Sequence, residues 1–187
     1  MSDIRLSQMD VENLEYIRNN VKSFLQDVAM RYVGRCQSYR LLDIAPQDHE
    51  GARPYFPNHV EVDTLDINPS SQCTFIADIC MNNCQLIPDN SYDFVVCTEV
   101  LEHTLRPFSA TQELFRLLKP EGLLFVSVPF NFRIHGPLPD CWRFTEHGLR
   151  ELLVDFNLLS LQELKTPGRP LMPVHYTVVA QKPKREQ

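Results

Sequence analysis

The sequence predicts an α/β fold: a doubly wound, seven-stranded, mostly parallel sheet with helices on both faces and an antiparallel last strand. Short apolar runs of strand length alternate with helical patterns from Tyr39 onward, as in successive βαβ units. Two runs, 92–100 and 123–130, are apolar almost throughout, which is typical of parallel strands buried on both faces. The length of 187 residues suits one domain, so we expect residues 1–187 to fold as a single unit.

The first predicted element is an amphipathic helix over about residues 11–35. Its apolar residues recur at intervals of three and four positions, which places them on one helical face. They are Val11, Leu14, Ile17, Val21, Phe24, Leu25, Val28, Ala29 and Tyr32. A helix of this kind covers another element, such as one face of the sheet.

The predicted strands show either an alternation of apolar residues or a short continuous apolar run. They cover residues 39–45, 59–67, 73–79, 92–100, 123–130, 158–165 and 175–182. A short helix is expected in the segment EGARPYF after the first strand. Two longer helices are expected further on: one over 107–119, ended by the turn at Lys119–Gly122, and one that Thr145 caps.

The charge balance and the cysteines exclude several classes of function. Lys and Arg number 18 against 24 Asp and Glu, so the net charge of −6 argues against nucleic acid and anionic membranes as partners. No apolar run approaches the roughly 18 residues that span a bilayer, and the polar start is unlike a secretory signal, so a cytoplasmic protein is expected. The six cysteines form no CxxC pair, which predicts scattered reduced thiols and no metal site.

Acidic residues stand where two predicted strands end. Ligands of open α/β sheets bind beyond the carboxyl ends of the strands. Asp66 ends the second strand, 23 residues after Asp43, and has the placement of an acid that accepts hydrogen bonds from ribose hydroxyls; equally, it could cap the turn in DINP. Asp78 in ADI could accept from an adenine amino group or cap its own turn. Both alternatives stay open for each residue.

Taken together, these segments resemble the class I S-adenosylmethionine-dependent methyltransferases, in particular the branch that acts on small molecules. The resemblance runs from about Tyr39 to Phe156. LLDIAPQD is similar to the family's first motif, TLDINP to its ribose-binding acid and FIADIC to its adenine-contacting segment. The most specific match is YDFVVCTEVLEHT followed by LLKPEGLLFVSVP. The resemblance implies a Rossmann-like core over 37–187, a helical lid over the cleft formed by 1–36, and S-adenosylmethionine as cofactor, with S-adenosylhomocysteine as product.

The resemblance also implies the cofactor-binding residues, which lie at successive strand ends. They are Asp43, Ile44, Ala45 and Pro46 for the methionine part, Asp66 and Ile67 for the ribose and the adenine edge, Asp78 and Ile79 for the adenine, and Thr98 and Glu99 beside the reacting methyl group.

The chain departs from the family in its first motif, which is usually rich in glycine. Here Ala45, Gln47 and His49 occupy positions where glycines are common, and the nearest glycine is Gly51. Glycine favours close approach of the backbone to a ligand and a positive φ, so each replacement is expected to cost on the order of 1 kcal/mol if the left-handed conformation is kept. This departure motivates a second hypothesis, in which the protein has lost turnover and serves as a binding module or partner subunit.

Two histidines are the candidates for proton transfer from an acceptor. His103 in LEHT and His135 in RIHG both follow strands and lie near the expected cleft. Methyl transfer from a sulfonium needs mainly alignment and a dry pocket, so a general base is optional. His103 could equally shape the cleft by hydrogen bonding.

The segment NFRIHGPLPDCWRFT carries the candidate substrate-binding residues Arg133, Trp142 and Arg143. An arginine fork binds a carboxylate or phosphate well, and an aromatic wall binds a flat group. The residues therefore point to a small, anionic or sugar-type acceptor, bound by a monomer or a homodimer. The structural alternative is that Asp140 pairs with Arg143 and that Trp142 fills core space.

Overall fold

The seven-stranded sheet is mostly parallel, as predicted. The protein is described by a computed structural model that covers residues 6–46 and 51–184. The strands lie in the order β3-β2-β1-β4-β5-β7-β6. Their bounds are β1 Tyr39–Ile44, β2 Val60–Asp66, β3 Phe75–Ile76, β4 Tyr92–Thr98, β5 Leu118–Pro129, β6 Asn157–Leu164 and β7 His175–Gln181. Strands β1 to β5 pair in parallel, whereas β7, the last strand, runs antiparallel between β5 and β6.

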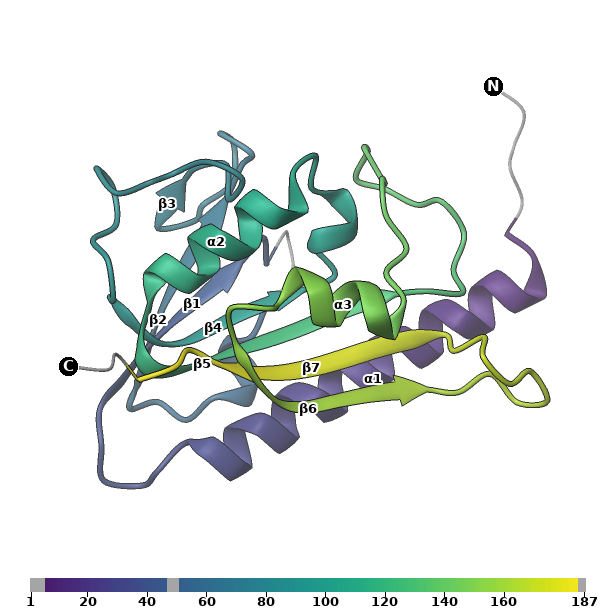
Figure 1. Ribbon diagram of the computed structural model, residues 1–187, viewed down its shortest axis with the longest axis horizontal. Coiled ribbons are helices and arrows are strands. Elements are labelled where there is room, and N and C mark those ends of the chain that lie inside the picture. The colour runs from purple at the N-terminus through teal and green to yellow at the C-terminus, as the bar shows by residue number, and fades with distance from the viewer. Residues whose placement is uncertain (1–5, 47–50, 185–187) are drawn as a thin grey trace.

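Helices cover both faces of the sheet (Figure 1). They are α1 (Gln8–Tyr32) on one face, and α2 (Pro107–Leu117) and α3 (Glu146–Leu152) on the other. Ser7 begins α1 through a capping box with Asp10, and the Thr145 hydroxyl caps α3 by accepting from the Gly148 amide. Short 3-10 helices occur at Arg53–Tyr55 and Leu101–His103. None of the described helices combines the length and apolar character that crossing a lipid bilayer requires.

An aromatic cluster joins α1 to the sheet. Phe125 of β5 is fully buried, and its ring lies 6.3 Å from that of Phe24 and 6.0 Å from that of Tyr32, both on α1. The same ring lies 5.8 Å from Phe94 of β4 and 6.4 Å from Phe56. Burial of so many rings at one place fixes α1 against the middle of the sheet.

Strands β3 and β5 differ most from their predicted bounds; the other strands agree within two residues at each end. Strand β3 contains only Phe75 and Ile76, because the chain turns at Asp78 as soon as it has passed β2. Strand β5 begins at Leu118 rather than 123: Leu118 pairs with Tyr92, and an irregularity follows before Leu123 pairs with Phe94. The predicted turn at Lys119–Gly122 is therefore absorbed into the start of a strand.

Helix α1 packs mainly on one face of the sheet. Its buried residues Leu25, Val28 and Ala29 pack on the sheet face opposite to α2 and α3. Its first half reaches the carboxyl edge of the sheet, where the Asn13 side chain donates to the Asn131 carbonyl at 3.0 Å. None of the described residues of α1 lines the main cavity, and the lid role of residues 1–36 stays a prediction.

Candidate active site

A cavity of about 540 Å³ opens at the carboxyl ends of the parallel strands. Its walls come from the ends of β1, β2 and β4, from the turn after β3, and from the segment 137–139. Ile67, Leu105 and Leu138 line it although they are apolar and respectively 66%, 69% and 76% exposed. Exposed apolar side chains around a hollow are the usual surroundings of a small-molecule ligand.

Several of the predicted residues meet at this cavity. Those that line it are Ile44, Ala45, Asp66, Ile67, Asp78, Ile79, Glu99 and His103. Those that lie outside its described walls are Asp43, Pro46, Thr98, Arg133, His135, Trp142 and Arg143. Gln47 and His49 fall outside the residues that the structure describes.

Asp66 and Asp78 each cap a turn while lining the cavity. Oδ1 of Asp66 accepts from the Asn68 amide at 2.7 Å, and Oδ1 of Asp78 accepts from the Cys80 amide at 2.8 Å. The two alternatives raised by the sequence are therefore compatible for Asp66, because Oδ1 caps the turn while Oδ2 is a separate acceptor that a ligand hydroxyl can use.

The first motif has the backbone conformation that glycine favours. Ala45 has a φ of 51°, and its amide donates to the Leu65 carbonyl at 2.7 Å. Gly51 has a φ of 56°, and a Cβ there would lie only 2.3 Å from Oδ2 of Asp43. That same Oδ2 accepts from the Ala52 amide at 2.6 Å. Gly51 and Ala52 thus lie directly against the Asp43 carboxyl, and Gly51 is required for that approach.

Asp43 lies against Gly51 and Ala52 rather than on the cavity wall. Its side chain is buried, and burial raises the pKa of the Asp43 carboxyl to about 7, although the hydrogen bond from Ala52 acts in the opposite direction. A carboxyl of this kind changes its charge near neutral pH.

Glu99 follows β4 with a φ of 55° and carries an acid into the cavity. Its Oε1 accepts from the Ser127 hydroxyl at 2.8 Å and lies 2.6 Å from Nε2 of His175. The other nitrogen of His175 lies 2.8 Å from the Asn20 amide nitrogen of α1. Since that amide nitrogen only donates, Nδ1 accepts and Nε2 donates its proton to Glu99. Burial alone would raise the pKa of Glu99, but His175 and Ser127 lower it below its usual value.

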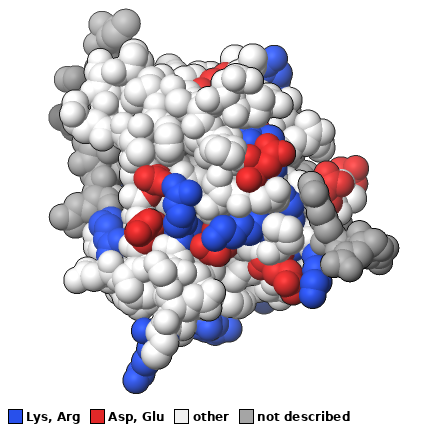
Figure 2. Space-filling view, turned by 90° about the vertical axis from the view of Figure 1, so that its left-hand side faces the viewer, with Lys and Arg blue, Asp and Glu red and all other residues white. Residues whose placement is uncertain are grey.

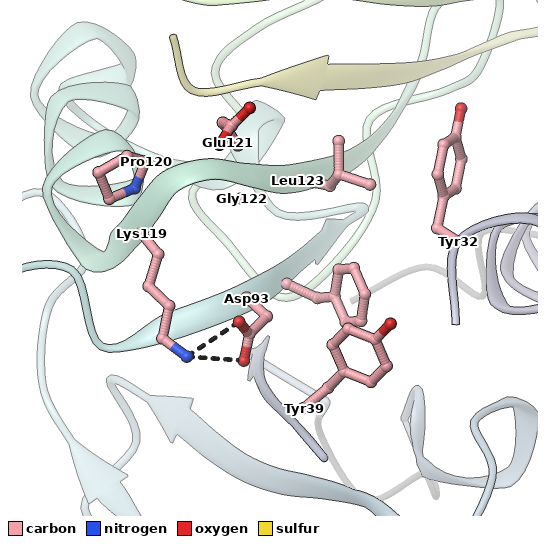
Figure 3. Close-up of a pocket in the computed structure, with 9 residues that line it drawn as sticks. Tyr32, Tyr39, Asp93, Lys119, Pro120, Glu121, Gly122 and Leu123 are labelled. Atoms are coloured by element: carbon pink, nitrogen blue, oxygen red, sulfur yellow. Dashed lines mark hydrogen bonds and ion pairs between the residues drawn. The ribbon is translucent and has the colours of Figure 1, made fainter. Parts of the chain in front are cut away.

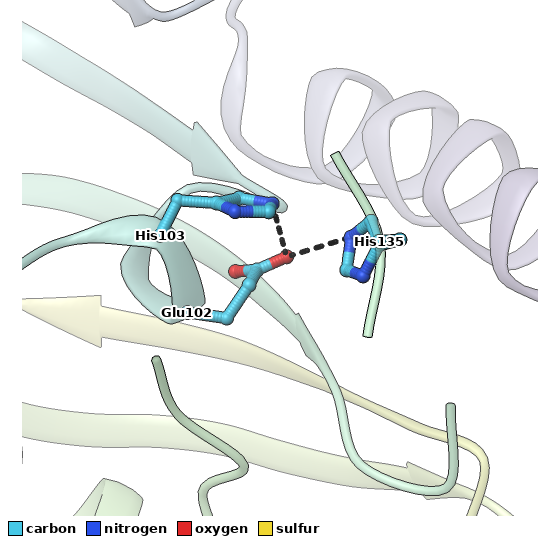
Figure 4. A group of neighbouring side chains, drawn as sticks. All are labelled: Glu102, His103 and His135. Atoms are coloured by element: carbon cyan, nitrogen blue, oxygen red, sulfur yellow. Dashed lines mark ion pairs between the residues drawn. The ribbon is translucent and has the colours of Figure 1, made fainter. Parts of the chain in front are cut away.

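Glu102 and the two predicted histidines form a second group (Figure 4). Glu102 and His103 come from the 3-10 helix after β4, and His135 comes from the segment after β5. Glu102 is fully buried, and burial together with the nearby Glu99 raises the pKa of its carboxyl well above the usual value. His103 lines the cavity, whereas His135 stands behind it.

The segment 131–145 holds its own charged groups in local contacts. Both oxygens of Asp140 accept from Arg143, at 2.5 and 2.7 Å, and Arg143 also donates to the carbonyls of Phe132 and Arg133. Burial opposes ionisation of Asp140, but Arg143 and the His135 amide lower the pKa of its carboxyl to about 2. The local Asp140–Arg143 pair is therefore present.

Trp142 is not a core residue. Its side chain is 41% exposed and stacks on Phe144 with ring centroids 6.1 Å apart. Its indole nitrogen donates to the Thr104 carbonyl at 2.7 Å. The suggestion that Trp142 fills core space is therefore wrong, because its polar edge ties the segment to the end of the 3-10 helix.

Sequence reasoning missed Glu102, His175, Ser127 and Asn20. Glu102 lies within the motif TEVLEHT, but its burial depends on the segment after β5, which no local pattern indicates. His175 begins a predicted strand, and no local pattern indicates that a residue 76 positions from Glu99 contacts it. All six cysteines are free, as predicted.

A second cavity, of about 280 Å³, lies at the opposite end of the strands (Figure 3). Its charged residues Asp93 and Lys119 pair with each other at 2.9 Å, so they offer little to a ligand. On the side of the molecule shown in Figure 2, acidic and basic side chains are interspersed. The chemistry-bearing groups thus gather at the carboxyl edge.

This sheet order is that of the Rossmann-like class I methyltransferases, whose cofactor is S-adenosylmethionine, and the family match below assigns the chain to them. Residues 17–164 match the family model described as "Methyltransferase domain", and the chain belongs to this family.

A curated relative is similar over part of its length. The ubiquinone biosynthesis O-methyltransferase of Glaesserella parasuis serovar 5 (strain SH0165) is 36% identical over 69 residues, which are 37% of this chain and 28% of the relative. The match therefore spans less than a third of that protein.

Solved structures share the fold at low identity. A methyltransferase of Methanosarcina mazei has a TM-score of 0.64 and 19% identity, covering 84% of this chain and 98% of its own. The 1,6-didemethyltoxoflavin-N1-methyltransferase of Burkholderia thailandensis, solved with S-adenosylhomocysteine, has a TM-score of 0.62 and 18% identity, covering 97% and 93%. The cyclase SpnF has a TM-score of 0.69 and 16% identity, covering 89% and 81%.

Proposed function

We propose that the protein transfers a methyl group from S-adenosylmethionine to a small acceptor, anionic or sugar-type. The observation that carries the proposal is the convergence of Asp66, Asp78 and Glu99, from successive strand ends, on one apolar-walled cavity. The cavity volume of about 540 Å³ and the exposed Ile67 beside Asp66 fit a nucleoside with a charged tail.

The chain's residues divide the binding work among them. Asp66 accepts from the ribose hydroxyls through Oδ2, while Oδ1 holds the turn. Ile67, Asp78 and Ile79 hold the adenine. The methionine part lies against Ile44 and Ala45 of the first motif, which Asp43 and Pro46 support from outside the cavity. Glu99 flanks the reacting centre, and Thr98 precedes it at the end of β4.

The cofactor supplies an activated methyl group. The protein aligns the acceptor for an in-line displacement and excludes water, which supplies most of the rate acceleration in such a reaction. His103 lines the cavity and is the candidate to accept a proton from the acceptor when no metal ion is bound; His135 is its neighbour outside the cavity wall. Arg133, Trp142 and Arg143 shape the acceptor end. We place the protein in the cytoplasm, as a monomer or homodimer.

A second candidate function is binding without turnover. It is favoured by the left-handed conformation of Ala45 in a loop where the family usually has glycine. Under this proposal the protein serves as a binding module or partner subunit.

Calorimetry tests the first proposal. S-adenosylmethionine and S-adenosylhomocysteine should bind the wild-type protein, and Asp66→Ala should weaken both by about 1–3 kcal/mol through loss of charge-assisted hydrogen bonds. Glu61→Ala, an exposed carboxylate on the same strand, is the matched control and should bind normally. No detectable binding of either compound at millimolar concentration would contradict the proposal, and binding without methyl transfer to any acceptor would support the second one.

A further inference from the structure

Glu102, His103 and His135 direct three electron-rich atoms toward one point (Figure 4). Oε1 of Glu102 lies 3.7 Å from Nε2 of His103 and 3.9 Å from Nε2 of His135. These distances are too long for hydrogen bonds. The three ligand atoms all lie within 4.8 Å of one another, so small movements of the side chains bring them to the spacing of about 3.0–3.4 Å between ligands that share one ion at bond lengths near 2.1 Å.

The contacts of the two imidazoles fix which nitrogen carries the proton. Nδ1 of His103 lies 3.0 Å from the Pro139 carbonyl, which only accepts, so Nδ1 is the donor. Nδ1 of His135 lies 3.3 Å from the Arg133 carbonyl, which only accepts, so Nδ1 is again the donor, and Oδ2 of Asp140 lies 3.0 Å from the same nitrogen. In the neutral rings both Nε2 atoms therefore present a lone pair to Glu102.

Glu102 has no partner to balance these lone pairs. Its carboxylate is fully buried, and neither oxygen has a hydrogen-bond partner within the described part of the chain. Buried polar groups are normally satisfied, yet the Glu102 carboxyl group faces two imidazole nitrogens without a hydrogen bond to either. A cation that displaces the carboxyl proton and binds between the three groups satisfies all of them.

The surroundings of the cluster hold it in place. The amides of Cys141 and Trp142 donate to the Glu102 carbonyl at 2.7 and 3.1 Å, which joins the two ligand-bearing segments. Each imidazole donates its other N–H to a carbonyl or carboxylate, the arrangement that orients histidines toward metal ions. Arg143 fixes Asp140 in turn through two hydrogen bonds.

We propose that Glu102, His103 and His135 form a binding site for one divalent transition-metal ion. Two imidazoles and one carboxylate favour Zn²⁺, Fe²⁺ or Mn²⁺ over Ca²⁺ and Mg²⁺, which prefer oxygen ligands. The side chains of His103 and His135 are 13% and 22% exposed, which gives an ion access to the buried carboxylate. This assignment differs from the expectation, based on cysteine spacing, that the chain has no metal site.

The site also defines the acceptor, in a step that rests on the proposed methyl transfer. An ion held by three protein ligands keeps open coordination positions for other ligands. Because His103 lines the cavity, these open positions lie beside the cavity. A hydroxyl oxygen there loses its proton to solvent more readily, because the ion stabilises the resulting negative charge. That oxygen then bonds to the methyl carbon while the carbon–sulfur bond breaks and its electron pair stays on sulfur. The acceptor class is thus an alcohol, enol or phenol.

The test uses the full chain, freed of metal by a chelator and then titrated with Zn²⁺, Mn²⁺, Co²⁺ or Mg²⁺ in separate calorimetric experiments. We expect one transition-metal ion per chain, at least tenfold tighter than Mg²⁺. Glu102→Gln and His135→Ala should each weaken binding at least tenfold, whereas His147→Ala, an exposed histidine on α3, should not. Circular dichroism verifies that each variant is folded.

Absorption spectra of the Co²⁺ complex exclude a competing explanation. Ligation by nitrogen and oxygen gives no thiolate charge-transfer band, whereas an ion held by the free cysteines gives one. A thiolate band, no stoichiometric binding, or binding that survives both Glu102→Gln and His135→Ala would overturn the site. If Glu102→Gln fails to fold, the wild-type protein still tests the site, because a bound transition-metal ion must raise the melting temperature of the wild-type protein.

Binding of S-adenosylmethionine, measured on the same samples, separates this inference from the proposed function. Cofactor binding without metal binding overturns the metal site and leaves methyl transfer standing. Metal binding without cofactor binding supports the site and contradicts methyl transfer.

Discussion

Asp43 shows how one buried acid couples folding to pH. The pKa of its carboxyl is about 7 in the folded protein, against 3.8 for an ordinary aspartate. The folded chain therefore binds this proton more tightly than the unfolded chain. The stability that the protonated Asp43 carboxyl contributes is fully present below about pH 4 and is lost as the pH rises toward 7.

We predict that Asp43→Asn flattens this dependence. The amide oxygen still accepts from Ala52 but has no charge to bury, so the wild-type protein should lose roughly 2–4 kcal/mol more than the variant between pH 4 and pH 8. Urea denaturation of both proteins at the two pH values measures the difference. Equal losses in the two proteins would show that Asp43 ionises normally when folded.

Arg143 also acts at the scale of a single residue. Among the residues that the structure describes, the buried Asp140 side chain forms ion pairs with Arg143 and His135 only. The Arg143 guanidinium is the permanently charged partner of the two. Arg143→Ala leaves that carboxylate poorly compensated and should lower the free energy of unfolding by about 3 kcal/mol.

Urea denaturation again gives the measurement for Arg143→Ala. Arg150→Ala is its control, because Arg150 pairs with Glu146 in an exposed contact on α3 and should cost well under about 1 kcal/mol. A stable Arg143→Ala with a raised KM for the acceptor would favour the role in substrate binding instead.

At the scale of elements, the aromatic cluster between α1 and the sheet leads to another prediction. Phe125→Ala removes the ring that Phe24, Tyr32 and Phe94 contact and should cost about 3–5 kcal/mol. Phe108→Ala, on α2 and 58% exposed, is the control and should cost less than about 1 kcal/mol. Denaturant midpoints of the two variants check this, and similar midpoints would contradict a structural role for the cluster.

The elements also show which parts of the fold a sequence encodes locally. The amphipathic spacing of α1 and the apolar runs of β4 and β5 are properties of neighbouring residues, so they predict the helix and the buried strands. The first residues of β5 were missed because Leu118 becomes a strand residue by pairing with Tyr92, 26 positions earlier. Register irregularities of this kind depend on the partner strand.

The candidate site divides in the same way. Asp66, Asp78 and Glu99 follow apolar strands directly, so their place at the carboxyl edge is predictable from sequence. Glu102 and His135 meet only because the backbone of Cys141 and Trp142 hydrogen-bonds to Glu102. Contacts between segments so far apart in the chain leave no periodic signal.

At the scale of the whole molecule, ligand binding should appear as stability. S-adenosylmethionine at a hundred times its dissociation constant adds about 2.7 kcal/mol to the free energy of unfolding. For 187 residues this corresponds to a rise in melting temperature of roughly 5–11 °C. Differential scanning fluorimetry measures it, with Asp66→Ala at the same ligand concentration as the comparison. An unchanged melting temperature at millimolar ligand would argue against a cofactor site.

The reversed direction of β7 has a practical consequence for protein engineering. Because this strand runs against β5, its first residue, His175, reaches the edge where the parallel strands end. The connection that precedes it, residues 165–174, is mostly exposed and looks like a harmless place for inserting a peptide tag. Lengthening it would displace the imidazole that orients Glu99, so a tag placed there would disturb the proposed reaction centre from the outside.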